Sequence, residues 1–230
     1  MTHPSSSAGA GMRLSGIWRY PVKSMGGETL HTAWLGDLGI TGDRIAHVVD
    51  GQGRLITSRS KPRLLLHHAR LGPNGEPTVD GRPWTSEEVS ADVERAAGKL
   101  ARLRLSRLDG PVRFDVLPLL VATDGAIAAF GYDPRRLRPN LIISGVPGLA
   151  ERTWERQMLR VGGAVIGVAS LRQRCIMTTF DPDTAEQDKA VLLKIWDDFE
   201  GRLALDCRVL QAGLVRVGDR VEMLAASEAG

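Results

Sequence analysis

Short runs of alternating apolar and polar residues dominate the chain and predict β-strands. Residues 13–20 (RLSGIWRY) alternate up to Pro21, and eight similar runs follow, bounded by Gly, Pro or Asp. These runs are residues 28–35, 44–49, 64–71, 141–144, 158–161, 165–169, 207–210 and 220–224. Many short strands with frequent turns are typical of barrels and sandwiches rather than of doubly wound parallel sheets.

Three segments predict short helices. Residues 90–98 end in a glycine, and residues 123–130 run from a threonine suited to N-capping to a glycine that stops the helix. Residues 188–199 form the clearest helix, which Asp188 can cap. Its apolar stripe, interpreted as core packing, consists of Leu192, Ile195, Trp196 and Phe199. The predicted fold class is therefore mainly β, a β-rich α+β protein with a few short helices.

A polar stretch with Gly and Pro, SRLDGP, separates two apolar segments and predicts a domain boundary. We therefore expect a disordered lead at residues 1–11, an N-terminal domain at residues 12–107 and a second domain at residues 108–230. The lead has no apolar core, so it does not predict a secretory signal. No apolar run approaches the roughly 18 residues of a membrane span.

Composition narrows the function classes. The chain is 43% hydrophobic and 25% charged, with a formal charge of +3, as in ordinary globular proteins. Its cations are spread along the chain, which does not favour a nucleic-acid-binding tail. The two cysteines, Cys175 and Cys207, are far apart, and no Cys/His cluster accompanies them. This pattern excludes a disulfide scaffold and an all-cysteine zinc site, and it favours a reducing, cytoplasmic location.

Two N-terminal segments carry polar groups that core packing does not explain. In YPVKS a strand stops at Pro21 and leaves Lys23 and Ser24 in a glycine-rich turn, a plausible anion seat or an ordinary solvated turn. Arg44 enters the strand of GDRIAHVVD, and Arg59 follows a Thr-Ser pair. These two arginines face one cleft or simply lie on the surface.

Two C-terminal segments add further candidates. In RLRPNLIISG, Pro139 favours an extended Arg138, and strand alternation places Arg138 and Asn140 on one face. This pair either binds a phosphate or a heterocycle edge or belongs to a structural turn. In RQRCIMTTFDPDT, arginines and threonines flank Cys175. Neighbouring cations favour a thiolate, which is a nucleophile or a soft metal ligand, whereas an inert buried thiol is the alternative.

Together and in this order, these segments resemble the MOSC-domain proteins that carry an N-terminal β-barrel domain, such as the mitochondrial amidoxime-reducing component and its bacterial counterparts. The motifs that carry the resemblance are IWRYPVKSM, LGDLGITGDRIAHVVD, TSRSKPRL, LRPNLIISG, RCIMTTFDPDT and VRVGDRVEML. They are spread over residues 14–224. The resemblance implies a MOSC-type β-barrel packed with an N-terminal β-barrel domain.

The resemblance also implies a cofactor site. A molybdenum cofactor of the molybdopterin type would lie in the cleft between the two β-rich units, with Cys175 as metal ligand and catalytic residue. Lys23, Ser24 and Arg44 match residues that hold the phosphate end of the cofactor. The other implied cofactor-binding residues are Arg138 and Asn140 of the RPN motif, Asp115 of a D-x-x-P segment, and the cleft positions Arg59 and Arg174.

Two departures from the family pattern bear on this site. Arg172 stands where many relatives have a second cysteine, and the extra cation could raise the site potential or favour an anionic substrate. Cys207 lies in a late strand, where it either approaches the cofactor or is an inert thiol.

The resemblance implies a molybdenum-dependent reductase of N-hydroxylated compounds or N-oxides. Electrons would come from an external carrier, a ferredoxin or a flavoprotein reductase, and the labile cofactor need not persist in recombinant protein. Two alternatives stay open: a sulfur carrier with a persulfide on Cys175, acting in molybdenum-cofactor or metal–sulfur biosynthesis, and a non-catalytic module that binds or stores the cofactor. Neither a nucleic acid nor a membrane is expected as a partner.

Overall fold

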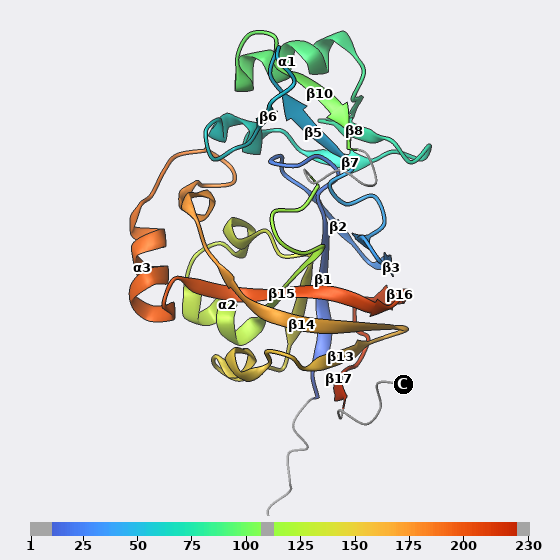
Figure 1. The fold of residues 1–230 in the computed structure, drawn as a ribbon, viewed down its shortest axis with the longest axis vertical. Helices are drawn as coiled ribbons and strands as arrows, with labels where there is room; N and C mark the ends of the chain where they lie inside the picture. The colour runs from blue at the N-terminus through green and yellow to red at the C-terminus, as the bar shows by residue number, and fades with distance from the viewer. Residues whose placement is uncertain (1–10, 107–112, 225–230) are drawn as a thin grey trace, which may run out of the picture.

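The computed structural model describes residues 11–106 and 113–224, and its largest element is an eight-stranded sheet. Neighbouring strands are antiparallel except for the parallel pair β11 and β12. The order is β17 (Val221–Leu224), β13 (Met158–Val161), β14 (Ala164–Gln173), β15 (Arg202–Gln211), β11 (Leu119–Thr123), β12 (Leu141–Ser144), β1 (Arg13–Arg19) and β2 (Glu28–Leu30). The first strand of the chain thus pairs beside strands from its second half (Figure 1).

The sheet closes on itself where β1 meets the start of β17. The Leu14 amide donates to the Asp219 carbonyl at 2.9 Å, and the Val221 amide donates to the Met12 carbonyl at 2.9 Å. An antiparallel bridge between Arg13 and Arg220 lies between these bonds. The closed sheet encloses an apolar core, so the predicted barrel within a mainly β fold is confirmed.

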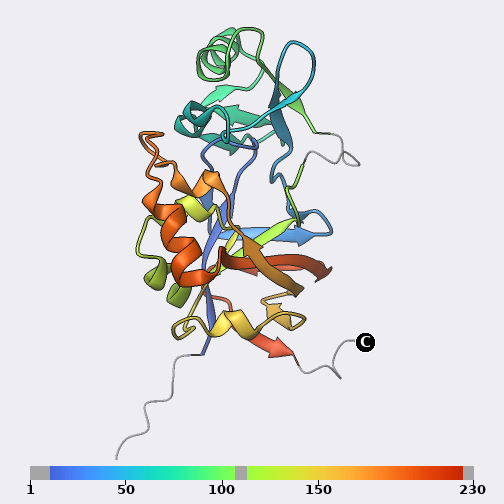
Figure 2. The same cartoon turned by 60° about the vertical axis from the view of Figure 1, so that its left-hand side comes forward.

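A smaller unit packs against one end of this barrel (Figures 1 and 2). It contains two three-stranded sheets and the helix α1 (Glu87–Ala97), which share an apolar core that includes Val48, Leu64 and Val93. The strands are β5 (Ala46–Val49), β6 (Leu55–Ile56) and β10 (Arg102–Leu105) in one sheet, and β7 (Ala69–Leu71), β8 (Pro77–Val79) and β9 (Arg82–Pro83) in the other.

Another three-stranded sheet combines strands from both halves of the chain. It consists of β16 (Gly213–Arg216), β3 (Thr32–Gly36) and β4 (Gly39–Ile40). The predicted boundary after residue 107 falls on residues 107–112, and most of the predicted lead falls on residues 1–10; both lie outside the described residues.

Capping explains where the helices begin and end. The Ser86 hydroxyl accepts from the Val89 amide, so α1 starts three residues before the predicted position. The helix α2 (Asp124–Phe130) begins and ends as predicted, since the Thr123 hydroxyl accepts from the Ala126 amide at 3.1 Å and Gly131 adopts a left-handed conformation. Among the described residues, no helix is long and apolar enough to cross a membrane.

The predicted stripe of the third helix is partly wrong. In α3 (Ala190–Phe199), Val191, Ile195 and Phe199 are buried, whereas Trp196 is 50% exposed. Residues spaced by four fall on one helix face, and this face packs in an apolar cluster with buried residues of α2. Trp196 lies about 100° around the helix from Ile195 and therefore falls outside this face. The N-cap of α3 is Lys189, not Asp188 as predicted, although the Asp188 carboxylate accepts from the Ala190 amide at 2.9 Å.

Two predicted strands are also corrected. Residues 64–71 form not one strand but the 3₁₀ helix η1 (Pro62–Leu66) followed by β7, because Pro62 sets a helical turn at the start of η1. Residues 28–35 divide at His31 into β2 and β3, which belong to different sheets. The described residues also form three further 3₁₀ helices, η2 (Pro134–Leu137), η3 (Ala150–Thr153) and η4 (Ile176–Thr179).

Candidate functional site

All nine residues that the resemblance assigns to the cofactor site line one cleft. They are Lys23, Ser24, Arg44, Arg59, Asp115, Arg138, Asn140, Arg174 and Cys175. Other residues of the lining carry no site role predicted from the sequence, including Thr57, Phe114, Arg136, Gln173, Met177 and Asp206. Asp206 could have been found from strand alternation, since its neighbours Leu205 and Cys207 both belong to the barrel core.

Three of these residues occupy a backbone conformation that L-residues rarely adopt. The φ angles are 74° for Ser24, 51° for Arg44 and 55° for Arg138. Pro139 predicted an extended Arg138, and this prediction is wrong. Arg138 is the C-terminal cap of η2, and its amide donates to the Arg135 carbonyl at 3.0 Å. Strained non-glycine positions that cluster in one cleft are typical of functional sites.

Asn140 is a structural anchor as well as a lining residue. Its side-chain oxygen accepts from the Leu120 amide at 3.1 Å and from Nη1 of Arg44 at 3.3 Å. Its side-chain nitrogen donates to the Trp18 carbonyl at 3.3 Å. From its position immediately before β12, Asn140 thus ties β11 to β1 and orients the Arg44 guanidinium.

Tyr20 forms the floor beneath two of the arginines. The guanidinium carbons of Arg44 and Arg138 lie 5.2 and 4.3 Å from the centre of its ring. Asp43 is fully buried, pairs with Arg44 and accepts from the Tyr20 amide at 2.7 Å. Burial raises the pKa of the Tyr20 hydroxyl to about 12, so this ring stays neutral beneath the two cations.

Asp115 is the shared counter-ion of three cleft cations. Its carboxylate lies 2.8 Å from Nζ of Lys23, 2.5 Å from Nη2 of Arg59 and 3.8 Å from Nη2 of Arg172. Burial alone would raise the pKa of this carboxyl, but the Lys23 hydrogen bond and the surrounding cations outweigh burial and lower it. Arg172 also pairs with Asp206 at 2.9 Å.

Arg138 and Arg174 differ from these cations because no carboxylate in the described part of the chain pairs with them. Nη2 of Arg138 and Nε of Arg174 are buried and have no hydrogen-bond partner, although Nη2 of Arg174 donates to the Leu137 carbonyl at 2.8 Å. Burial lowers the pKa of each guanidinium to about 10, so both remain cationic at neutral pH. Two buried, unsatisfied cationic nitrogens in a cleft wall fit an anionic ligand.

The two cysteines lie in opposite environments. Cys175 is a half-buried free thiol in the cleft, immediately before η4. Burial alone would lower the pKa of the Arg59 guanidinium, but its interactions with Cys175 and Asp115 raise it. Cys207 is fully buried in the barrel core, where burial raises the pKa of its thiol far above the usual range. It therefore behaves as an inert strand thiol.

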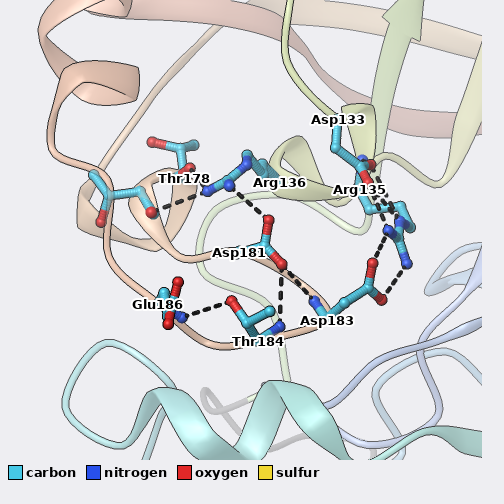
Figure 3. Close-up of polar contacts among 9 residues, drawn as sticks. Asp133, Arg135, Arg136, Thr178, Asp181, Asp183, Thr184 and Glu186 are labelled. Carbon is cyan, nitrogen blue, oxygen red and sulfur yellow. Dashed lines mark hydrogen bonds and ion pairs between the residues drawn. The ribbon is translucent and has the colours of Figure 1, made fainter.

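The loop after Cys175 is held in place by the two arginines of η2 (Figure 3). Arg135 forms two hydrogen bonds to the Asp183 carboxylate, at 2.8 and 2.5 Å. Arg136 pairs with Asp181 at 2.9 Å and donates to the Thr179 carbonyl at 3.0 Å. The Asp181 carboxylate also accepts from the amides of residues 183 and 184, which makes the DPDT turn that the sequence predicts.

A second cluster of titratable groups lies outside the cleft. The ligand atoms of His67, Asp80 and Asp92 lie within 4.8 Å of one another. However, Asp92 pairs with Arg82 and Arg95, and Asp80 lies 2.8 Å from Nδ1 of His67. Because Arg82 and Arg95 already pair with these carboxylates, the cluster is an ion-pair network of the N-terminal unit.

Comparison with protein families gives two matches. A model described as the MOSC domain matches residues 122–222, and a model described as the MOSC N-terminal beta barrel domain matches residues 11–113. Together the two models account for most of the chain.

Curated proteins and solved structures add relatives at low identity. Mitochondrial amidoxime reducing component 2 from Macaca fascicularis and from Homo sapiens is 24% identical over 229 residues, an alignment that spans 75% of this chain and 68% of the relative. The YuaD protein from Bacillus subtilis has a TM-score of 0.46 at 15% identity and covers 93% of this chain and 96% of its own. YiiM from Geobacillus stearothermophilus has a TM-score of 0.38 at 15% identity, covering 47% of this chain and 55% of its own.

Proposed function

Because this chain belongs to the MOSC-domain proteins and carries their N-terminal beta barrel domain, we propose that its cleft binds a molybdenum cofactor and that the protein reduces N-hydroxylated compounds. The relatives named as amidoxime reducing components supply the reaction class. The observation that carries the proposal is the cleft itself, which combines a half-buried thiol with two buried cationic nitrogens that have no partner.

The residues in the cleft fit such a cofactor. A molybdopterin-type group carries a phosphate, and the unpartnered nitrogens of Arg138 and Arg174 need an acceptor of this kind. Lys23 and Ser24 lie in the same cleft and would add a cation and a hydroxyl. Cys175 would provide a thiolate, a soft ligand suited to molybdenum, and it is the cysteine that lines the cleft.

Each side chain has a definable task in this proposal. The bound cofactor would supply two-electron redox chemistry at the metal, which protein side chains alone do not provide. Cys175 would hold the metal, and Arg59, which lines the same cleft, would place a cation near it. Asp115 offsets part of the positive charge of Lys23, Arg59 and Arg172, so the cleft attracts an anion without excluding a neutral substrate.

Electrons would come from an external carrier protein. The sequence contains two cysteines, and Cys207 is fully buried in the core, so this chain offers no cluster of thiolates for an iron–sulfur centre.

The deciding experiment compares wild type, Cys175→Ser and the matched control Cys207→Ser, each produced in a molybdate-supplied, cofactor-competent host. We expect near-stoichiometric molybdenum and reduction of N-hydroxylated compounds in wild type and in the control, and at least a tenfold loss of both in Cys175→Ser. Metal content is measured by mass spectrometry, and turnover is measured with a chemical electron donor.

Two outcomes would overturn the proposal in different ways. Protein without molybdenum but with a cyanide-labile persulfide on Cys175 would establish a sulfur carrier. Protein with stoichiometric cofactor and no turnover under any donor would establish a binding or storage module.

A further inference from the structure

Two carboxylates line the cofactor cleft, and one arginine contacts them both. Asp115 lies in the segment before β11, and Asp206 lies in β15 between two residues of the barrel core. Nη1 of Arg172 lies 2.9 Å from Oδ1 of Asp206, and its Nη2 lies 3.8 Å from Oδ2 of Asp115. Asp206 has no task in the cofactor binding proposed above.

The surroundings of the two carboxylates shift their pKa values in opposite directions. The Asp115 side chain is 34% exposed, and the cations around it outweigh burial and lower the pKa of its carboxyl. The Asp206 side chain is 4% exposed, and burial raises the pKa of its carboxyl although Arg172 opposes this shift. When two acids of one site differ in this way, the acid with the raised pKa is the one suited to carry a proton.

The strands on either side of β15 place few charges around Asp206 (Figure 1). Its partners in the strand registers are Leu120 of β11 and Ser170 of β14, and both are uncharged. Cys207, the next residue of β15, is a core thiol that burial keeps neutral by raising its pKa far above the usual range. The charged groups that act on Asp206 are Arg172, Arg174 and Asp115. The two arginines lower its pKa and the other carboxylate raises it, but burial is the largest effect.

The other titratable side chains of the cleft are less suited to release a proton. Of the residues that the structure describes, no histidine lines the cleft. The arginines of the lining hold their protons at neutral pH, and Cys175 is the proposed metal ligand. Nζ of Lys23 lies 2.8 Å from the Asp115 carboxylate and belongs to the proposed anion seat. Asp206 is therefore the acid that the cleft offers.

Reduction of an N-hydroxylated compound consumes protons as well as electrons. The N–O bond breaks, the external carrier supplies two electrons, the oxygen leaves as water and the nitrogen becomes an amine. Two protons balance this reaction, one on the departing oxygen and one on the nitrogen. A side chain that is positioned to protonate the departing oxygen accelerates such a step.

We propose that Asp206 is the proton donor for the departing oxygen and that Arg172 is the positioning residue that holds its carboxyl at the cleft wall. Asp206 gives its proton to the oxygen as the N–O bond breaks. The carboxylate that results is stabilised by the Arg172 hydrogen bond until it regains a proton from solvent. The second proton comes from solvent and ends on the nitrogen. This inference rests on the proposed reductase function.

The first test compares wild type with Asp206→Asn and with the matched control Glu151→Gln. Glu151 is also a buried acid whose pKa burial raises, but it does not line the cleft. Molybdenum content and turnover are measured for each protein from the cofactor-competent host. We expect wild-type molybdenum in both variants and wild-type turnover in the control. Turnover of Asp206→Asn should fall at least about 100-fold, the lower end of the range for general acid catalysis.

The pH profile of turnover shows whether the lost group acts as an acid. A proton donor works only while it is protonated, so wild-type turnover should fall as the pH rises through the pKa of Asp206. This limb of the profile should be absent from Asp206→Asn and present in Asp206→Glu and Glu151→Gln. Arg172→Gln removes a cation that lowers the pKa of Asp206, so the limb should move to higher pH. A merely structural role of Arg172 would not move it.

A second readout uses the cofactor-free protein. Carbon NMR of the aspartate carboxyls follows each titration, and the variants Asp206→Asn and Asp115→Asn assign the two signals. We expect Asp206 to titrate at a higher pH than Asp115, and at a still higher pH in Arg172→Gln. Thermal unfolding verifies that each variant is folded, and Arg172→Gln provides a test that does not depend on Asp206→Asn.

Three results would overturn the inference. The first is Asp206→Asn with wild-type molybdenum, wild-type turnover and an unchanged pH limb. The second is a limb that stays in place in Arg172→Gln. The third is titration of Asp206 at or below the pH at which Asp115 titrates. Wild type that binds no molybdenum or has no turnover would refute the proposed function instead, and the NMR titration would still decide the order of the two carboxyls.

Discussion

The inside of the barrel and the cleft beside it are built from the same strands but have opposite chemistry. In β15, Leu205 and Cys207 belong to the apolar core, whereas Asp206 between them lines the cleft. In β11, Leu119 and Val121 face the core, and Leu120 lines the cleft. Strand alternation thus gives one backbone two tasks, because the inner face supplies stability and the outer face supplies charge and function.

The largest difference between the two regions should appear when a core side chain is truncated. Ile143 is fully buried in β12, so Ile143→Ala should lower the free energy of unfolding by about 2–5 kcal/mol. Ile142 lies on the other face of the same strand and is partly exposed, so Ile142→Ala should cost clearly less. Urea denaturation measures both. Equal losses would mean that the two faces of β12 do not differ as described.

The cysteine pair separates stability from reactivity. Cys207→Ser places a hydroxyl in the barrel core and should cost about 1–3 kcal/mol of unfolding free energy. Cys175→Ser should change stability by no more than about 0.5 kcal/mol, since Cys175 lies outside the core. In native protein a thiol reagent should label Cys175 and spare Cys207 until the protein unfolds. Rapid labelling of Cys207 in native protein would contradict the closed barrel.

Asp115 tests how far the cleft depends on its internal counter-ion. Its pKa is lowered in the folded state, so it stabilises the protein above its unfolded pKa of about 3.9 and loses this effect as the pH falls. Asp115→Asn should therefore destabilise the protein at pH 7 and converge with wild type in acid. The loss should stay below about 1 kcal/mol, because this side chain is 34% exposed and solvent screens it. Urea denaturation at several pH values measures it, and a constant difference down to pH 2 would refute the assignment.

Substitution of Glu151 should give the smallest change in stability, and it should stabilise the protein where Asp115→Asn destabilises it. It is fully buried, Oε1 has no partner, and the Thr123 hydroxyl donates to Oε2 at 3.2 Å. Burial raises its pKa in the folded state, so stability falls as the pH rises above the unfolded pKa of about 4.3. Glu151→Gln avoids this loss and should stabilise the protein at pH 7 by up to about 1 kcal/mol. Thermal unfolding at pH 4 and pH 7 checks the sign, and a less stable variant at pH 7 would contradict it.

Local patterns were enough to predict many elements of this fold. The hydroxyl cap of Thr123 and the stop at Gly131 bound the seven-residue helix α2, so signals next to the helix in the sequence are enough to predict it. The cleft residues were predicted from motifs that resemble a family, and the structure places all of them along one space. Their roles in binding a cofactor stay predictions.

Long-range contacts were outside the reach of these patterns. Arg59 and Asp115 are 56 positions apart, so their ion pair depends on how two units pack and leaves no local trace. Asn140 was expected to read a ligand, yet its amide also joins three backbone segments, and only the packed sheet shows this. The left-handed backbone of Arg138 opposes the preference set by its proline, because capping of η2 is the stronger local constraint.

The closure of the barrel also constrains when the protein can be assembled. β1 is synthesised first, but its partner β12 follows more than a hundred residues later, and the Arg13 side chain bonds to the Gly218 carbonyl, 205 positions away. On the ribosome, β1 can pair early with β2, but it must wait for β12 and for the start of β17 while most of the chain is translated. Since the cleft takes residues from both halves, up to Asp206 of β15, its complete lining forms only after translation has passed β15.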